Sequence, residues 1–284
     1  MKDKTRLTGE EIRTCVLAAM IDKGVDGDSL AKAWAVRWPL HPEILGTSQK
    51  IEKGEKINVL TSIVYLAPAT ESVAYGGCNM CPLASAGCAK ACLGANSKRL
   101  KMSYGSNSKA WKTLLWLYRP DIFKALLMKE IGLLRGRAHR KGMTPAVRLN
   151  GSADIVWEVH FPEIFKAYPD VVFYDYTKIK SRFYRQLPVN YHLTFSRSEC
   201  NHEDAIELLA AGFNVAVVFE NLPMAVESGF AGFPVFNGDE TDYRPSDPKG
   251  VVVGLAVKAD VHDDSGFIVN NGPRPKKVRS KVAA

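Results

Sequence analysis

The chain has 284 residues, of which 46% are hydrophobic and 24% charged, and its formal net charge is +8. This composition is normal for a globular protein, and the length allows one large domain or two ordinary ones. It argues against a membrane protein, because no apolar run reaches the roughly 18 residues of a membrane helix. The N-terminal stretch MKDKTRLTGEEIRT also lacks an apolar signal region. We therefore expect a protein of the reducing cytoplasm that has no membrane contact.

Residues 1–45 are predicted to form a small helical N-terminal extension. The sequence TGEE supplies Thr8 as a helix N-cap and Glu11 as its capping-box partner. A second helix over DSLAKAWAVRW is predicted to start with a cap at Asp28 or Ser29. The polar stretch GTSQKIEKGEK then reads as a linker to the main part of the chain.

From residue 58 onward, short apolar segments alternate with helix-like segments. Seven apolar segments have the length and composition of buried strands, at residues 58–69, 146–154, 171–178, 191–199, 214–221, 233–242 and 250–258. Residues 106–141 show a helical spacing of apolar side chains with a break at Pro120. Shorter helices are predicted between later strands, at residues 156–168, 180–187 and 202–212.

Strand–helix alternation of this kind implies parallel strands joined by helical crossovers. The predicted fold class is α/β, with residues 46–270 forming a complete or partial TIM-like barrel that serves as the catalytic domain. An open, doubly wound sheet is the alternative. The sequence has no glycine-rich dinucleotide fingerprint, which makes this alternative slightly less favoured. Residues 271–284 are expected to form a basic, disordered tail.

A cysteine-rich loop over residues 76–95 holds Cys78, Cys81, Cys88 and Cys92. In a reducing compartment such a group is more often metal-binding or catalytic than disulfide-bonded. The spacing C-x2-C-x6-C-x3-C is compatible with a tetrahedral Zn²⁺ site and with an iron–sulfur cluster such as [4Fe–4S]. The small residues around the thiols leave room for more than one ion.

A cluster held by only three of these cysteines would keep one iron open. That iron could bind substrate or S-adenosylmethionine. However, the order of spacings differs from the usual radical-enzyme order of x3 followed by x2, which counts against a radical mechanism.

Polar residues gather where the predicted strands end, and chemistry in α/β folds sits beyond the carboxyl ends of strands. The candidate catalytic residues are Asn150, Asp154, Asp175, Glu199 and Asp239. The candidate substrate- or phosphate-binding residues are Lys178, Ser196, Arg197 and Lys258. Asp175 lies inside an apolar strand, where an isolated carboxylate would be costly to bury. Structural alternatives are that Asp154 caps the following helix and that Asp239 forms a turn.

The positive charge is unevenly distributed along the chain. Residues 98–141 contain twelve lysines and arginines against only two acids, and residues 271–284 add five more basic residues. This asymmetry favours an anionic partner, with nucleic acid or a nucleotide first. The alternative is a solvated basic helix face followed by a disordered tail. The sequence indicates no oligomeric state.

Several long motifs resemble a group of bacteriophage proteins related to the phage gene product 88 family. They include CPLASAGCAKACL, TPAVRLNGSADIVWE, FYDYTK, NYHLTFSRSE and GDETDYRPSDPKGVVVGLAVK, within a resemblance that covers residues 44–269. The C-P, G-C and A-C-L landmarks of that group fall on Cys81, Cys88 and Cys92, which makes Cys78 the least secure ligand. The resemblance implies a phage protein in the host cytoplasm during infection.

These observations predict a phage α/β-barrel enzyme with a cysteine-bound metal centre that modifies a base or nucleotide. An architectural analogy to base transglycosylases assigns nucleophilic or acid–base roles to Asp154 and Asp175. One alternative is an iron–sulfur redox enzyme or one resembling radical S-adenosylmethionine enzymes. The other is a non-catalytic, metal-stapled nucleic-acid-binding protein for phage replication or host takeover.

Overall fold

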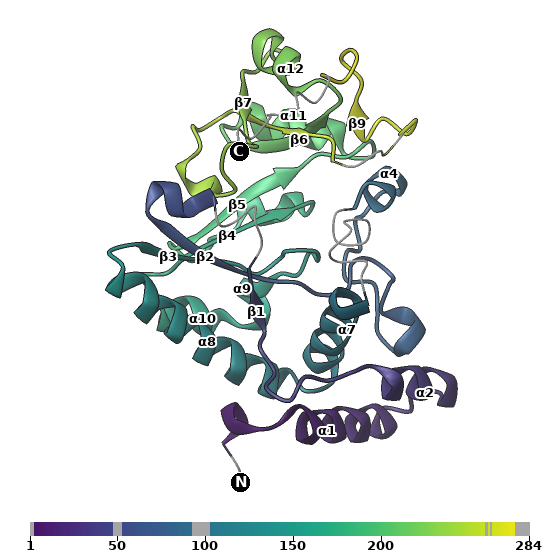
Figure 1. Cartoon of the computed structure of the whole chain (residues 1–284). Helices are drawn as coiled ribbons and strands as arrows, with labels where there is room; N and C mark the ends of the chain where they lie inside the picture. Colours follow the sequence, from purple (N-terminus) through teal and green to yellow (C-terminus); the bar gives the residue numbers. More distant parts are fainter. Residues whose placement is uncertain (1–2, 48–52, 93–102, 259–260, 262, 276–284) are drawn as a thin grey trace, which may run out of the picture.

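A twisted sheet of nine strands runs through the centre of the molecule (Figure 1). The structure is a computed structural model that describes residues 3–47, 53–92, 103–258, 261 and 263–275. The strands are β1 (Leu45–Gly46), β2 (Val59–Val64), β3 (Thr144–Arg148), β4 (Val172–Thr177), β5 (Tyr191–Ser196), β6 (Val215–Phe219), β7 (Val235–Asn237), β8 (Val252–Ala256) and β9 (Ile268–Val269).

The strand order is β1-β2-β3-β4-β5-β6-β8-β7, and β9 also pairs with β6. Every pairing is parallel except that of β1 with β2. The seven predicted strands correspond to β2 through β8, which confirms the α/β class, whereas the two-residue strands β1 and β9 were not predicted. Among the described strands no pairing joins β1 to β7, so the sheet has two edges and is not closed into a ring.

Helices and helical turns connect these strands, and most cover the sheet. The α-helices are α1 (Gly9–Asp22), α2 (Gly27–Ala35), α4 (Ala86–Lys90), α7 (Ser103–Tyr118), α8 (Pro120–Arg140), α9 (Trp157–His160), α10 (Pro162–Ala167), α11 (His202–Ala210) and α12 (Leu222–Ser228). The short 3-10 turns are η1 (Lys4–Arg6), η2 (Lys53–Ile57), η3 (Val73–Tyr75), η4 (Lys180–Tyr184) and η5 (Arg244–Ser246). None of the helices in the described part of the chain is long and apolar enough to cross a membrane.

Local sequence signals account for most helix boundaries. Thr8 and Glu11 form the predicted capping box at the start of α1. Helix α2 begins earlier than predicted, because the side chain of Asp26 accepts a hydrogen bond from the backbone N–H of Ser29. The helix predicted over residues 180–187 was wrong, since only the 3-10 turn η4 forms there. Arg182 and Phe183 are buried in this turn, and the extended backbone of Arg185 (φ −101°, ψ 156°) ends it.

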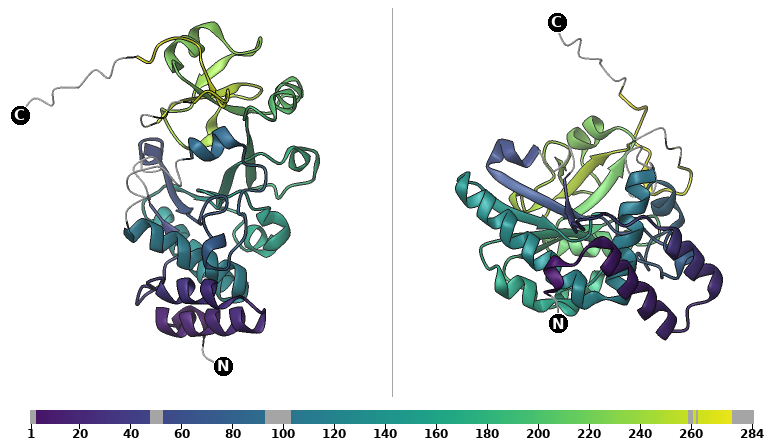
Figure 2. Two further views of the ribbon diagram at one scale, coloured as in Figure 1. Left: turned by 90° about the vertical axis from the view of Figure 1, so that its right-hand side faces the viewer. Right: turned by 60° about the horizontal axis from the view of Figure 1, so that its bottom comes forward.

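The N-terminal helices pack into the main core. Ile12, Val16 and Met20 of α1 are fully buried in the same hydrophobic cluster as α7, α8 and the helical side of β2–β5. A second cluster joins α11 and α12 to β5–β8. Figures 1 and 2 show this arrangement, with α1 and α2 beneath α7 and α8, and with α11 and α12 at the far end of the sheet.

The segment that follows β7 covers part of the opposite face of the sheet. Side chains alternate between faces along a strand, so Phe173 packs on the helices while Tyr174 faces the other way. Tyr243 packs edge-on against Tyr174 with ring centroids 5.6 Å apart. Asp242 pairs with Arg148 at 2.7 Å. The segment that carries Asp242 and Tyr243 therefore covers part of this face.

We expect Ile131→Ala in α8 to lower the free energy of unfolding by about 2–5 kcal/mol, because this fully buried side chain would leave a cavity in the main core. The matched control is Leu133→Ala on the same helix, where the side chain is 59% exposed. That change should stay within about 0.5 kcal/mol. Urea denaturation followed by circular dichroism measures both, and equal losses would contradict this packing of α8.

Candidate active site

A cavity of about 510 Å³ lies at the carboxyl ends of the parallel strands. Its size falls in the range of small-molecule sites. One wall comes from the ends of β3, β4, β5, β6 and β8, and the other from the segment after β2, the cysteine loop and Phe267. The predicted site residues that line it are Cys81, Cys88, Cys92, Asn150, Asp154, Lys178, Ser196, Asp239 and Lys258.

The first half of the cysteine loop is fastened to the segments that follow β2 and β3. The backbone N–H of Met80 donates to the carbonyl of Ala69 at 2.9 Å, and the N–H of Asp154 donates to the carbonyl of Met80 at 2.9 Å. The thiol of Cys81 lies 3.6 Å from the carbonyl oxygen of Ser152. These contacts direct Cys81 toward the cavity.

Glu199 anchors the second half of the loop. Its carboxylate accepts hydrogen bonds from the Ser85 hydroxyl at 2.6 Å and from the Gly87 N–H at 2.8 Å, at the start of α4. A Cβ on Gly87 would lie 2.1 Å from the Ser265 hydroxyl oxygen and 2.5 Å from the Phe267 Cβ, so only glycine fits between these segments. Figure 1 shows α4 beside the chain that leads into β9. Glu199, predicted as catalytic, is thus placed where it positions the cysteine loop.

The cysteines of the loop differ in their surroundings. Burial raises the pKa of the Cys81 thiol to about 11, and burial also raises the pKa of Cys88 although nearby Lys178 opposes this. Cys78 is exposed, lies 3.8 Å from the sulfur of Met80 and does not line the cavity. Among the described residues, no three His, Cys, Asp or Glu side chains are placed to hold a metal ion. Residues 93–95 of the predicted loop lie outside the described part.

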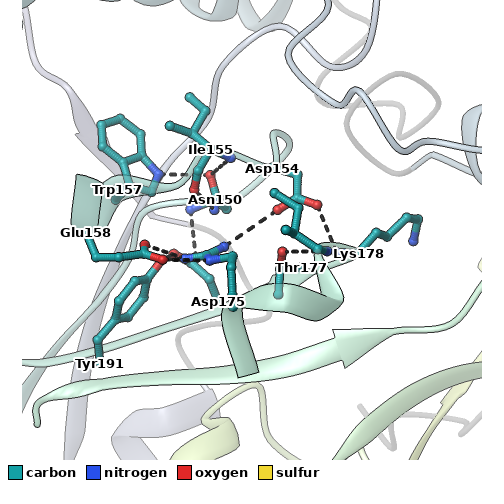
Figure 3. A network of polar contacts seen from close by, with 11 residues as sticks. Asn150, Asp154, Ile155, Trp157, Glu158, Asp175, Thr177, Lys178 and Tyr191 are labelled. Carbon is teal, nitrogen blue, oxygen red and sulfur yellow. Dashed lines mark hydrogen bonds and ion pairs between the residues drawn. The ribbon is translucent and has the colours of Figure 1, made fainter. Parts of the chain in front are cut away.

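Asp175 belongs to a network of polar contacts (Figure 3) and is not among the residues that line the cavity. It is 0% exposed, and its carboxylate accepts the backbone N–H of Asn150 at 2.7 Å and the hydroxyl of Tyr191 at 2.8 Å. Asn150 in turn uses its side chain to hold the next loop. Its Oδ1 accepts from the Ile155 N–H at 3.0 Å and from the Trp157 indole at 2.8 Å, and its Nδ2 donates to the Ile155 carbonyl at 2.9 Å. Asp175 therefore shapes the cavity wall without facing the cavity.

Arg182 links this network to Asp154. Its buried guanidinium makes two hydrogen bonds to Glu158, at 2.9 and 2.7 Å, and donates to the Tyr191 hydroxyl at 3.0 Å. The remaining nitrogen, NH1, lies 3.7 Å from Oδ1 of Asp154. The other oxygen of Asp154 accepts the backbone N–H of Lys178 at 2.8 Å. Burial raises the pKa of Asp154, which lines the cavity.

Two further groups of predicted residues sit on opposite sides of the cavity. The Lys178 ammonium donates to the Ser196 hydroxyl at 2.7 Å, beyond the ends of β4 and β5. The Lys258 ammonium pairs with Asp239 at 2.5 Å, beyond the ends of β7 and β8. The cavity wall thus carries both acids and bases, some of them paired with each other.

Arg197 lies elsewhere than predicted. Its NH1 donates to the carbonyl oxygens of Gly266 and Phe267 at 2.5 and 3.1 Å, which fastens the end of β5 to the start of β9. It lines a different cavity, together with His202 and Phe230. The structure therefore uses this guanidinium to hold β9.

Five of the basic residues that the structure describes in segment 98–141 are buried or paired with acids. Lys109 and Lys112 are buried. Arg119, Lys124 and Arg135 form ion pairs with Asp121, Glu163 and Asp170. Arg137, Arg140 and Lys141 stand exposed near the end of α8, just before the amino end of β3 and thus away from the strand ends that form the cavity. Lys98, Arg99, Lys101 and tail residues 276–284 lie outside the described residues.

The cavity-lining residues that were not predicted as site residues include Arg148, Tyr176 and Phe267. Arg148 and Tyr176 line it from β3 and β4, and the Arg148 guanidinium lies 4.9 Å from the Tyr176 ring centroid. Phe267 lines it from the turn before β9. Alternation along β3 and β4 could have indicated the first two, since both share a face with neighbouring polar positions. Nothing local marks Phe267, because its place depends on a pairing distant in sequence.

We expect Asp175→Asn to flatten the pH dependence of stability. Burial raises the pKa of Asp175 from its ordinary 3.8 to about 7. The folded state then holds this proton more tightly than the unfolded state, so the resulting stability is full below the ordinary pKa and is lost as pH rises toward neutrality. Urea unfolding across this pH range should show that the free energy of unfolding of the wild type falls by a few kcal/mol at most, since each unit of pKa shift corresponds to about 1.4 kcal/mol. The fall should be smaller in the variant.

The control is Asp121→Asn. A hydrogen bond from Arg119 holds the pKa of the Asp121 carboxyl well below its usual range. That group adds stability above its ordinary pKa and loses it in acid, so the control variant should remove a change of opposite sign. A steeper decline with rising pH in Asp175→Asn than in the wild type would contradict the buried, proton-binding state of Asp175.

Comparison with known proteins assigns a family but no close relative of known structure. The family model described as gene product 88 matches residues 43–271, which include the whole sheet from β1 to β9 and the cysteine loop but not α1 and α2. No curated protein and no solved structure matches this chain. Because the family model spans most of its length, this chain belongs to the gene product 88 family.

Proposed function

We propose that this protein is a phage enzyme that modifies a base or nucleotide in the strand-end cavity, next to a metal centre held by Cys81, Cys88 and Cys92. One observation carries the proposal: these three thiols line the same cavity as the strand-end carboxylates and lysines. A metal centre that only stabilised the cysteine loop would not need to line the same cavity as Asp154 and Lys178. We place the enzyme in the host cytoplasm.

The donor set supports a metal centre with one open position. Three thiols reach the cavity, while the exposed Cys78 does not. Thiolates bind metal cations directly, so a bound cation would offset the cost that burial imposes on ionising Cys81 and Cys88. As they stand, no three donors in the described part are placed for a metal, so binding would require the loop to draw its thiols together.

We favour a [4Fe–4S] cluster over a single zinc ion. The loop residues that face the cavity beside the cysteines are small, namely Ala84, Ala89 and Ala91, which leaves room for the larger group. Cys81, Cys88 and Cys92 would hold such a cluster, which would have an open iron for redox chemistry on a substrate or on S-adenosylmethionine. Zinc in the same place would instead keep a water as fourth ligand.

Other residues of the cavity would take part in the chemistry or position the groups that do. Asp154 lines the cavity and burial raises its pKa, so its carboxyl group can take up a proton from a substrate and return it. Lys178, beside Ser196, can orient an anionic group. Asp175 is a positioning residue, because it acts on the cavity through the backbone of Asn150.

The architecture is compatible with a partial barrel. Strands β2 to β6 stand in chain order, each added beside the previous one, as in barrel folds and unlike the reversed order of a doubly wound sheet. In barrels the active site lies at the carboxyl ends of the strands. The cavity has that position here, which agrees with a catalytic rather than a purely structural role.

Metal content tests the first part of the proposal. Protein purified without oxygen is expected to be brown and to contain iron and sulfide, because thiolate-bound clusters absorb visible light. Cys81→Ser, Cys88→Ser and Cys92→Ser should each lose most of the iron, whereas Cys78→Ser and Cys200→Ser should retain it. Elemental analysis and the visible spectrum measure this. A colourless protein with one zinc contradicts the cluster, and iron loss in Cys78→Ser contradicts the three-cysteine set.

Turnover tests the second part. Asp154→Asn should lower the rate of base or nucleotide modification by roughly 10²–10⁴-fold, the usual range for a lost acid–base group. Mass spectrometry of nucleosides and nucleotides from cells that express each variant detects the product. Asp170→Asn, on the exposed surface beside Arg135, is the control and should keep wild-type activity. No product with wild-type protein, together with salt-sensitive DNA binding, would instead favour the non-catalytic alternative.

A further inference from the structure

We infer that the cavity binds a single nucleotide unit, with the base at Asp154 and the phosphate at Lys258, and that it excludes duplex nucleic acid. This inference rests on the proposed function and narrows its substrate. It follows from three features of the cavity wall: a polar end at β3 and β4, a charged end at β7 and β8, and an apolar stretch between them.

The first end carries two buried groups that make no hydrogen bond in the described part of the chain. Oδ1 of Asp154 forms an ion pair with the Arg182 guanidinium at 3.7 Å, a distance too long for a hydrogen bond. The hydroxyl of Tyr176, which also lines the cavity, likewise makes no hydrogen bond in the described part. A buried acceptor without a hydrogen bond is costly unless a ligand supplies a donor. The N–H groups on the edge of a nucleobase are donors of that kind.

The second end offers a cation. Lys258 is partly exposed and pairs with Asp239, and both line the cavity. An ammonium group has three protons, and Asp239 takes one of them, so a phosphate can accept the others. The carboxylate of Asp239 also accepts the N–H of Ala256 at 3.2 Å, which keeps this ion pair at the end of β8.

The stretch between the two ends suits a flat ring. Val218, Leu255 and Phe267 line it with apolar surface. On the nearby strand, the Tyr176 ring is held by the Arg148 guanidinium, whose partner Asp242 lies 2.7 Å away. Aromatic and apolar side chains are the surfaces on which bases stack.

Size then separates one nucleotide from longer nucleic acid. Three strand-to-strand steps separate β4 from β8, which amounts to roughly 14 Å at the usual strand spacing. A cavity of about 510 Å³ has no space for stacked base pairs. A polynucleotide could enter only by presenting one unstacked nucleotide, at the energetic cost that base flipping carries.

Calorimetric titration of the full-length protein tests this with defined probes: the four ribonucleoside monophosphates, the matching nucleosides, inorganic phosphate and a short DNA duplex. At least one monophosphate should bind at least tenfold more tightly than its nucleoside and more tightly than the duplex. Lys258→Ala should weaken the monophosphate at least tenfold and leave the nucleoside unchanged. Asp154→Asn should weaken both at least tenfold and leave phosphate binding unchanged. Tyr176→Phe, a smaller change at the same end, should weaken both less.

The control is Lys166→Ala on the exposed surface of α10, which should bind like the wild type. Melting temperatures identify any variant that fails to fold, and Tyr176→Phe then takes the place of Asp154→Asn. Tighter binding of the duplex, or an equal effect of Lys258→Ala on nucleoside and monophosphate, overturns the inference. If the protein binds a mononucleotide but has neither metal nor turnover, this inference holds and the proposed function is wrong. If it turns over DNA but binds no mononucleotide, the proposed function holds and this inference is wrong.

Discussion

The cavity depends on one buried carboxylate. Strands β3 and β4 pair only through Ala146 with Val172 and Val147 with Phe173, so their carboxyl ends separate before the cavity is reached. Beyond that point the carboxylate of Asp175 connects them, because it accepts the N–H of Asn150. A side chain thus takes the place of a missing backbone hydrogen bond, and it can do so only while the surrounding core keeps water away from it.

The rest of the site follows from that connection. Asn150 fixes the turn of the chain toward Trp157, and the turn carries Asp154 to the cavity. On the far side, β9 pairs with β6 beyond the point where β5 ends, so Phe267 completes the wall. The cysteine loop lines the cavity between the turn that carries Asp154 and the segment that carries Phe267. Its thiols face the cavity because Glu199 and the segment after β3 hold the loop at both ends.

Sequence patterns predicted the strands but not the contacts that each strand-end side chain makes. Apolar runs and their spacing identified β2 to β8, and several of the strand-end candidates line the cavity, because strand positions follow from local periodicity. Whether a strand-end side chain faces the cavity depends on distant partners. Arg197 contacts the carbonyls before β9, and Asp175 is covered by Tyr191. The same holds for the basic segment 98–141. Most of its described lysines and arginines are buried or paired with acids, and these partners could not be predicted from the local sequence.

The close fit around Gly87 has a consequence for the order of assembly during synthesis. The cysteine loop leaves the ribosome early, but the surface against which α4 rests is made of Ser265, Phe267 and Glu199, which are synthesised much later. Until those residues emerge, the nascent chain has its thiols but nothing to hold α4 in place. The cavity therefore takes its final shape only after residues 265–267 have been synthesised, and a product truncated before them would carry the cysteines without the pocket that they line.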